Sequence, residues 1–344
     1  RNLMTTLPTQ KDRKIGELNV HPIGLGCMNL SHAYGPAMAH NDAIAFLRDA
    51  VSMGYNFLDT ATIYGMGKNE SLIGEALRGR RSEFVLASKC VMGFKDGKRI
   101  LDARPDTIIS ACEASLKRLQ TETIDLYYMH RPDPNVPIEE SVGALAQLVT
   151  QGKIRMIGLS EMSAETLRAA NKEHTISAMQ SEYSLMTRNP EIAVIKACHE
   201  LDVAFVPFSP VGRGYLANEP LDQYGYHDKD LRKSFPRFTD PHFSANLPLL
   251  DIARQHADSL NCTIAQLALA WTLAQDERAV PIPGTTNRQH LEDNFNAAEI
   301  EIPQDMLDQI NKEFAAEAIS GPRYSPAAQS TVTTECYDFE LAQS

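Results

Sequence analysis

Four polar side chains suited to acid chemistry follow short apolar runs along the chain. Asp59 and Lys89 each close such a run, Tyr64 comes shortly after Asp59, and His130 closes a further run. An ammonium group beside a phenol favours the phenolate and lowers the phenol pKa below its ordinary value of about 10, while a carboxylate holds the ammonium charged. We therefore expect Tyr64 to donate a proton near neutral pH, assisted by the other three residues.

Other chemistries have weaker support. A single Asp, Lys or His at the end of a strand often only bonds to a loop, and a tyrosine often only packs, so the argument depends on all four residues together. The 10 histidines include no close pair at ligand spacing, and the six cysteines lie at least 22 positions apart, which disfavours a metal site. No Gly-x-Ser-x-Gly segment supports a hydrolase.

The elements that must position these residues alternate between short β-branched or aromatic runs and longer amphipathic segments. This alternation is typical of βα units on a parallel sheet, and eight units favour a closed (β/α)8 barrel over an open doubly wound sheet, which stays the alternative. The predicted strands are Ile23–Cys27, Asn56–Asp59, Phe84–Ser88, Ile124–Met129, Arg155–Leu159, Ser177–Met179, Val203–Pro207 and Ala279–Ile282. In such a barrel, residues at the carboxyl ends of strands meet on one face.

Helix starts are predicted at Asn41, Pro105 and Asn287, because these residue types favour the first positions of helices. Residues Lys14 to Val20 are predicted to form a hairpin over the bottom of the barrel. A long segment rich in Gly, Pro and aromatic residues, Gly212 to Ala245, is predicted to be a functional or mobile loop.

We expect one barrel domain over residues 4–326 and a tail over 327–344, with the chain largely unstructured from Ser320 onward. Met4 is expected to be the natural start, with Arg1 to Leu3 an added remnant.

The formal net charge of −11 disfavours nucleic acid as a partner, because binding a phosphate backbone requires a basic surface. The most apolar helical stretch, Ile264 to Ala274, is too short to cross a bilayer and no signal peptide is evident, so no membrane association is expected. The wide spacing of the six cysteines, with no Cys-x-x-Cys pair, fits reduced thiols and a cytoplasmic location. The oligomeric state cannot be read from the sequence.

Two loops late in the chain are suited to binding phosphate. Residues Ser209 to Arg213 follow the seventh predicted strand, and Pro283 to Arg288 run from the eighth strand into a helix. Loops at these positions of a barrel, with a helix N-terminus nearby, favour anions. Each is also compatible with an ordinary turn. The early Gly24 to Asn29 segment lacks the third glycine of a dinucleotide fingerprint and is set aside.

Ser160-Glu161, Arg232 to Phe238 and Gly284-Thr285-Thr286 most resemble one group of the aldo-keto reductases, the bacterial and plant general aldehyde reductases. Several segments, in order and at suitable spacing from about Ile15 to Tyr324, resemble the aldo-keto reductases as a family. These segments are Asn56-Phe57-Leu58-Asp59-Thr60-Ala61 with Tyr64-Gly65, Lys89, Tyr128-Met129-His130, Gly152-Lys153-Ile154-Arg155 with Gly158-Leu159-Ser160, Gln180-Ser181-Glu182-Tyr183-Ser184, and Pro281-Ile282-Pro283-Gly284-Thr285.

The resemblance implies a barrel oxidoreductase that uses NADPH/NADP+ and acts on a small carbonyl substrate. It implies that Tyr64 protonates the carbonyl oxygen, Lys89 lowers its pKa, Asp59 pairs with Lys89, and His130 orients the carbonyl. The implied cofactor residues are Ser160, Gln180, Phe208, Ser209, Val211, Gly212, Arg213, Thr285, Asn287, Arg288, His290, Asp293 and Asn294.

Three positions depart from the family pattern. Glu161 stands where Asn is common, and Asn287 and His290 stand where relatives place Lys or Arg, which weakens the expected clamp on the 2′-phosphate; Arg288 is expected to compensate. The substrate pocket is expected to be walled by Met28, Asn29, Tyr34, Met92, Phe94, Arg131 and residues 214–245.

Two other functions stay open. One is a dehydrogenase that works mainly in the direction of alcohol oxidation. The other is a regulatory subunit that binds the cofactor with little turnover, since related barrels serve as potassium-channel partners.

Overall fold

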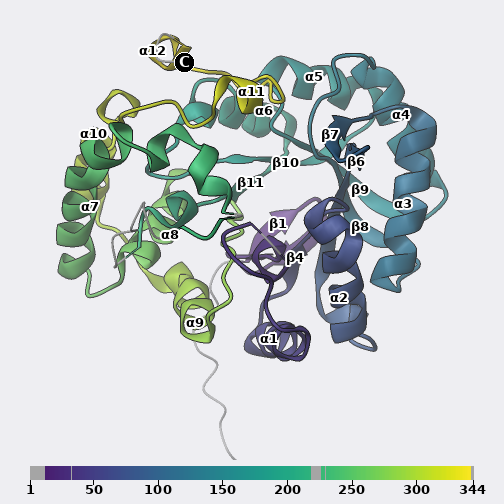
Figure 1. The fold of residues 1–344 in the computed structure, drawn as a ribbon, viewed down its shortest axis with the longest axis horizontal. Helices are drawn as coiled ribbons and strands as arrows, with labels where there is room; N and C mark the ends of the chain where they lie inside the picture. The colour runs from purple at the N-terminus through teal and green to yellow at the C-terminus, as the bar shows by residue number, and fades with distance from the viewer. Residues whose placement is uncertain (1–11, 32, 218–225, 229, 342–344) are drawn as a thin grey trace, which may run out of the picture.

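A curled parallel sheet forms the centre of the molecule (Figure 1). The computed structural model describes residues 12–31, 33–217, 226–228 and 230–341, so the expected start at Met4 lies outside the described residues. Seven strands lie in chain order in this sheet, each parallel to the next. They are β3 (Leu25–Gly26), β4 (Phe57–Asp59), β5 (Val85–Cys90), β8 (Ile124–Met129), β9 (Ile154–Ser160), β10 (Ile176–Glu182) and β11 (Ala204–Phe208).

The eighth predicted strand closes this sheet, although it forms only half of a regular ladder. On one side the amides of Val280 and Ile282 donate to β11 at 2.8 and 3.0 Å. On the other side the carbonyl oxygens of Pro281 and Pro283 accept from the amides of Gly24, directly before β3, and Gly26 in β3, at 2.9 and 3.1 Å. Proline has no N–H, so neither of these two residues can donate back to β3. The closed (β/α)8 barrel is confirmed.

The barrel interior is filled by inward-facing side chains from alternate strand positions, including Phe57, Val206 and Ile282. The expected N-terminal hairpin, β1 (Arg13–Ile15) and β2 (Leu18–Val20), adds Ile15 and Val20 to this same cluster and closes one end. The interior has little spare space. A Cβ at Gly158 would lie 2.3 Å from the ring of Tyr128, so only glycine fits opposite that ring.

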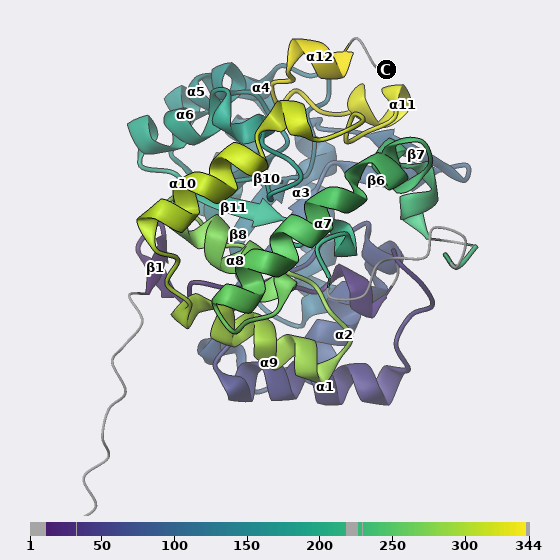
Figure 2. The same ribbon diagram turned by 90° about the vertical axis from the view of Figure 1, so that its left-hand side faces the viewer.

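Helices surround the sheet on its outer side, and α1 lies beside α9 (Figures 1 and 2). Their bounds are α1 (His40–Met53), α2 (Lys68–Ala76), α3 (Pro105–Leu119), α4 (Ile138–Thr150), α5 (Ala164–Glu173), α6 (Val194–Leu201), α7 (His242–Ser259), α8 (Ile264–Gln275), α9 (Arg288–Asn296), α10 (Gln304–Glu313), α11 (Pro326–Gln329) and α12 (Asp338–Leu341). None of the helices in the described part of the chain combines the length and apolar character needed to cross a membrane.

The predicted helix starts at Pro105 and Asn287 are confirmed, and the Asn287 side chain accepts from two amides of the first turn of α9. The start at Asn41 is wrong by one to two residues: α1 begins at His40 with Ala39 as its N-cap. The predicted loop from Gly212 to Ala245 lies outside the described residues at 218–225 and 229. Its described parts form short 3-10 helices at Gly212–Gly214, Leu231–Ser234 and Pro236–Phe238, and its last four residues already belong to α7, so the loop ends earlier than predicted.

The C-terminal segment is ordered, so the expectation of an unstructured chain beyond Ser320 is wrong. The Thr333 amide donates to the Glu161 carbonyl oxygen at 2.9 Å, and Asn189 donates to the Glu340 carboxylate at 2.6 Å. Figures 1 and 2 show α11 and α12 together at the upper edge of the molecule. These contacts join residues far apart in the sequence, which is why no local pattern indicated them. The division into a barrel over 4–326 and a tail over 327–344 stays a prediction.

Trp271 on α8 is fully buried, donates its indole N–H to Asn311 at 2.9 Å, and packs on the Tyr183 ring with centroids 5.2 Å apart. We predict that Trp271→Ala lowers the free energy of unfolding by about 3–5 kcal/mol, the usual cost of deleting a large buried aromatic side chain. Urea unfolding followed by circular dichroism measures this loss. Phe94→Ala is the control, because the Phe94 side chain is 49% exposed. Equal losses in the two variants would contradict the assignment of Trp271 to the core.

Candidate active site

The ammonium of Lys89, the carboxylate of Asp59 and the phenol of Tyr64 form one connected group. The Lys89 Nζ donates to Asp59 Oδ1 and, at 3.3 Å, to the Tyr64 hydroxyl oxygen. A third bond of 2.9 Å goes to the Thr60 carbonyl oxygen. The Lys89 side chain is fully buried, so these three oxygens replace the water that its charge would otherwise require.

Strand register brings these groups together. Asp59 pairs with Ala87 across β4 and β5, and Lys89 lies two residues further along β5, on the same side of the sheet. Tyr64 begins the short 3-10 helix Tyr64–Gly67, in which Gly65 adopts a left-handed backbone with φ of 57°. The loop that carries Tyr64 is held to β5 by a hydrogen bond from the Thr62 amide to the Lys89 carbonyl oxygen at 3.2 Å.

Burial and Lys89 act on Tyr64 in opposite directions. Burial raises the pKa of Tyr64, and the nearby Lys89 ammonium lowers it by less, so the net pKa lies above its ordinary value. This corrects the expectation that Lys89 brings the pKa below that value. Burial lowers the pKa of Lys89, but Asp59 and Tyr64 outweigh it and the pKa is raised. At neutral pH the site therefore holds a protonated phenol beside a charged ammonium.

His130 follows β8 and faces Tyr64, with ring centroids 5.8 Å apart and the rings nearly perpendicular. Its amide donates to the Cys90 carbonyl oxygen at 3.2 Å, which fixes the backbone at the strand end. Burial lowers the pKa of His130 well below its ordinary value, and the charges of Arg131, Lys89 and Arg99 lower it further. The imidazole is therefore neutral, and its Nδ1 has no hydrogen-bond partner among the described residues.

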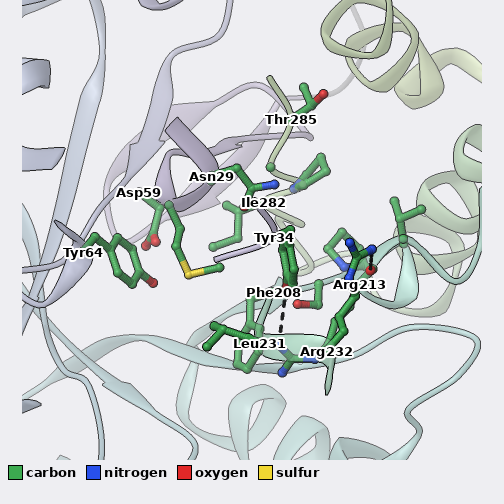
Figure 3. A pocket seen from close by; sticks show the side chains of 18 of the residues that line it. Asn29, Tyr34, Asp59, Tyr64, Phe208, Arg213, Leu231, Arg232, Ile282 and Thr285 are labelled. Carbon is green, nitrogen blue, oxygen red and sulfur yellow. Dashed lines mark hydrogen bonds between the residues drawn. The ribbon is translucent and has the colours of Figure 1, made fainter. Parts of the chain in front are cut away.

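These groups open onto a cavity of about 650 Å³ (Figure 3). Figure 3 shows Asp59 and Tyr64 on one side of the cavity and Arg213 and Arg232 on the other. Lys89 lies behind this surface. The implied cofactor residues that line the cavity are Ser160, Gln180, Phe208, Ser209, Val211, Arg213, Thr285, Asn287, His290, Asp293 and Asn294. The barrel therefore gathers residues from six separate parts of the sequence around one space.

Two implied cofactor residues do not line the cavity. Gly212 has a φ of 57° and donates its amide to the Ser209 carbonyl oxygen at 2.9 Å, so it shapes the loop. Arg288 is 71% exposed and forms an ion pair with Asp49 at 2.6 Å. Of the expected wall residues, Phe94 also lies outside the lining, whereas Met28, Asn29, Tyr34, Met92 and Arg131 belong to it.

Two of the lining residues already have partners inside the protein. Gln180 Nε2 donates to Asp59 Oδ2 at 2.9 Å, so both carboxylate oxygens of Asp59 are occupied. Ser160 Oγ accepts from the Arg131 guanidinium at 3.3 Å. A ligand at this end of the cavity meets side chains that the barrel has already oriented.

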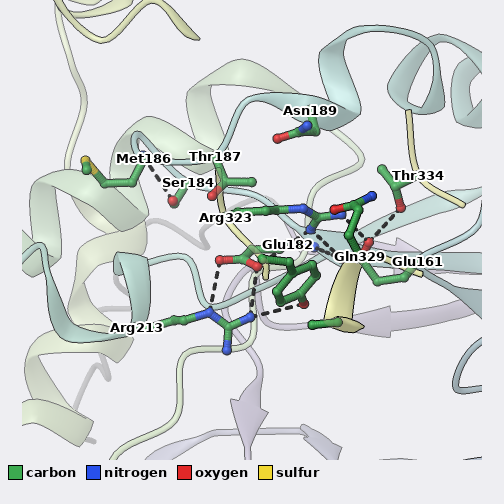
Figure 4. Close-up of polar contacts among 12 residues, drawn as sticks. Glu161, Glu182, Ser184, Met186, Thr187, Asn189, Arg213, Arg323, Gln329 and Thr334 are labelled. Carbon is green, nitrogen blue, oxygen red and sulfur yellow. Dashed lines mark hydrogen bonds and ion pairs between the residues drawn. The ribbon is translucent and has the colours of Figure 1, made fainter. Parts of the chain in front are cut away.

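Glu161 faces away from the cavity and into the C-terminal segment (Figure 4). Its carboxylate accepts from Arg323 at 2.8 and 2.6 Å and from the Thr334 hydroxyl at 2.7 Å. Burial raises the pKa of Glu161, but the charge and hydrogen bonds of Arg323, together with the charge of Arg131 and the Glu182 amide, lower it by more, and the net pKa is about 2. Glu161 is therefore a charged anchor for the C-terminal segment.

A second buried ion pair, with Glu182, holds Arg213. Its guanidinium donates to Glu182 at 3.2 and 2.8 Å and to the Tyr324 hydroxyl at 3.2 Å (Figure 4). The same guanidinium lies over the rings of Phe235 and Phe208, at 4.5 and 5.7 Å from their centroids. Arg213 thus reaches the cavity in a fixed position.

Sequence reasoning missed several residues of this site. Glu182 ends β10, so the rule that strand ends carry the chemistry indicates it. Arg99 lies in a hairpin, β6 (Met92–Lys95) and β7 (Lys98–Leu101), whose Asp96-Gly97 turn is a strong hairpin signal. Arg323 offers no such signal, because its partner lies 162 residues earlier.

Comparison with known proteins agrees with this architecture. The model of the Aldo/keto reductase family matches residues 22–313. A probable aldo-keto reductase 1 from Glycine max is 40% identical over 309 residues, covering 89% of this chain and 88% of the relative. An NADP(+) aldo-keto reductase from Schizosaccharomyces pombe is 40% identical over 336 residues, covering 95% of this chain and 97% of the relative.

Among solved structures, an aldo/keto reductase from Klebsiella pneumoniae in complex with NADP and acetate superposes with a TM-score of 0.70 at 27% identity. The match covers 89% of this chain and 96% of that one. The family model matches most of the chain, and the alignments with the two sequence relatives cover 88% and 97% of those relatives. The chain therefore belongs to the aldo/keto reductase family.

Proposed function

We propose that the chain reduces aldehydes or activated ketones to alcohols with NADPH, and that Tyr64 donates the proton. The observation that carries this proposal is the contact of the Tyr64 hydroxyl with the buried Lys89–Asp59 ion pair at the edge of a cavity of about 650 Å³. Membership of the family, and relatives that are named for or solved with NADP, support the cofactor.

The cavity residues fit this cofactor. Phe208 presents a partly exposed aromatic face, and the arginine and helix N-terminus needed near phosphates are supplied by Arg213 and α9. We propose Ser160, Gln180 and Phe208 for the nicotinamide, with Ser209, Val211, Gly212 and Arg213 for the pyrophosphate. For the adenosine end we propose Thr285, Asn287, His290, Asp293 and Asn294. When bound, the cofactor supplies the hydride.

The protein's own part is acid catalysis. The substrate carbonyl oxygen takes the proton of the Tyr64 hydroxyl, and the Lys89 ammonium stabilises the phenolate left behind. Asp59 keeps Lys89 charged and in place. His130 is neutral and donates an N–H to the same carbonyl oxygen, which orients it towards Tyr64.

Steady turnover separates this function from the regulatory alternative. With an aldehyde panel, NADPH absorbance should fall continuously, whereas a regulatory subunit would bind NADPH and barely consume it. Comparing both directions near neutral pH tests the dehydrogenase alternative, since a protonated Tyr64 favours reduction. A cytoplasmic location stays a prediction.

We predict that Tyr64→Phe lowers kcat for aldehyde reduction by about 10²–10⁴-fold, the usual loss on removing a proton donor. NADPH affinity, measured by fluorescence titration, should stay nearly unchanged because the hydroxyl acts on the substrate oxygen. Tyr337→Phe is the matched control, since that hydroxyl bonds to the Arg188 carbonyl oxygen outside the cavity. Near-normal turnover by Tyr64→Phe would show that another group is the acid.

The pH dependence of reduction follows from the protonated state of Tyr64. Reduction needs the phenol, so kcat falls as pH rises through the Tyr64 pKa. Lys89 lowers that pKa, so Lys89→Met should move the alkaline limb to higher pH. The same variant should reduce kcat at neutral pH, because the ammonium that stabilises the phenolate is gone. Lys153→Met, on a partly exposed lysine paired with Glu113, should leave the limb in place. An unmoved limb in Lys89→Met would contradict the role of Lys89.

For the cofactor, we predict that NADPH binds at least about tenfold more tightly than NADH, since one hydrogen bond to a charged phosphate contributes about 1.5–3 kcal/mol. His290→Ala should reduce this ratio, because His290 lines the cavity at the start of α9. Arg288→Ala should leave it unchanged, because the exposed Arg288 side chain contacts Asp49 and does not line the cavity. Fluorescence titration of both nucleotides decides, and equal affinities in the parent protein would refute NADP preference.

A further inference from the structure

Two of the four arginines that line the cavity have no acidic partner among the described residues. Arg213 pairs with Glu182 at 2.8 Å, and Arg232 pairs with a buried aspartate at 2.7 Å. Arg99 and Arg131, in contrast, form no ion pair with any residue that the structure describes. This asymmetry sets these two cations apart from those that hold the fold together.

Arg131 is placed beside the reacting groups. It follows His130 directly, and its Nη1 donates to the His130 carbonyl oxygen at 2.6 Å and to Ser160 Oγ at 3.3 Å. Its Nε and Nη2 make no hydrogen bond within the described part of the chain. One end of the guanidinium is therefore fixed, while other N–H groups remain for a ligand.

Arg99 reaches the same cavity from the β6–β7 hairpin. Arg99 lines the cavity and is also exposed to solvent. Partial burial lowers the pKa of Arg99, and the charge of Arg131 lowers it further, so the two guanidinium groups lie close enough to repel one another. Both charges also act on His130. The charge of Arg131 lowers the pKa of the buried carboxylate of Glu161, but that carboxylate already accepts hydrogen bonds from Arg323 and Thr334. Neither Arg99 nor Arg131 therefore has a carboxylate of its own among the described residues, and their repulsion, which water screens at Arg99, favours an anion in this part of the cavity.

We propose that Arg99 and Arg131 bind a carboxylate group carried by the carbonyl substrate. This inference rests on the proposed reductase function and names its substrate class: an aldehyde or ketone that bears a carboxylate a few bonds from the carbonyl. The planar fork of a guanidinium matches the two oxygens of a carboxylate, and the anion offsets the repulsion between the two cations. The carbonyl then lies towards His130 and Tyr64, and the carboxylate lies towards the hairpin.

The test compares substrates that differ only in charge. These are 4-oxobutanoate against 4-oxobutanamide, and 4-carboxybenzaldehyde against 4-carbamoylbenzaldehyde. We expect kcat/KM to favour the carboxylate of at least one pair by about tenfold or more in the parent protein. The preference should fall in Arg99→Gln and in Arg131→Gln, and should be near one in the double variant. Arg131→Lys should retain part of it, because the charge remains.

Lys98→Gln is the matched control, since this exposed cation lies next to Arg99 but outside the cavity lining. Its carboxylate preference should equal that of the parent protein. Reduction of the amides with no preference for either carboxylate would overturn this inference and leave the proposed reductase function standing.

Absence of turnover with every substrate would instead contradict the proposed function, and a binding measurement then decides the anion site alone. Isothermal titration calorimetry of the NADP+-loaded protein compares 4-hydroxybutanoate with 4-hydroxybutanamide. We expect the anion to bind at least about tenfold more tightly, and the difference to vanish in the double variant. Equal binding of the two compounds to the parent protein would overturn the site.

Discussion

A lysine ammonium buried in the barrel is the constraint on which the site depends. A charge without water is tolerated only where oxygens replace the solvent, and Lys89 finds them on Asp59, Thr60 and Tyr64. Because removing one partner of a buried pair typically costs about 3–5 kcal/mol, the surrounding backbone must hold all three in place. Strand register and the bond from Gln180 to Asp59 do this. The same geometry leaves the Tyr64 hydroxyl at the cavity surface.

Buried ion pairs and hydrogen bonds also attach the C-terminal segment to the cavity wall. Glu161 and Arg323 form a buried pair, and Glu182 holds Arg213 beneath the Tyr324 hydroxyl. These pairs make the C-terminal segment part of the site. Arg213 is held in a fixed position by Glu182 and still lines the cavity, whereas Arg99 and Arg131 line it without an ion pair among the described residues.

The barrel and the grouping of Asp59, Tyr64, Lys89 and His130 at one edge of it were predictable, because both follow from local pattern. Apolar runs buried on a parallel sheet mark the strands, and residues such as Asp59 and His130 stand directly at their ends. The features that were not predictable depend on contacts between residues far apart in the sequence or on how deeply a side chain is buried. Thr334 has no local signal for its bond to Glu161, and the net pKa of Tyr64 depends on burial that neighbouring residues do not reveal.

We propose that Lys89 controls the proton held by Tyr64. The most direct test is the Tyr64 pKa itself, measured by NMR titration of protein labelled with ¹³C at tyrosine Cζ and assigned with Tyr64→Phe. We expect the Tyr64 pKa to lie above its ordinary value in the parent protein, because burial outweighs Lys89, and to be higher still in Lys89→Met. A Tyr64 pKa that is unchanged or lower in Lys89→Met would contradict this proposal.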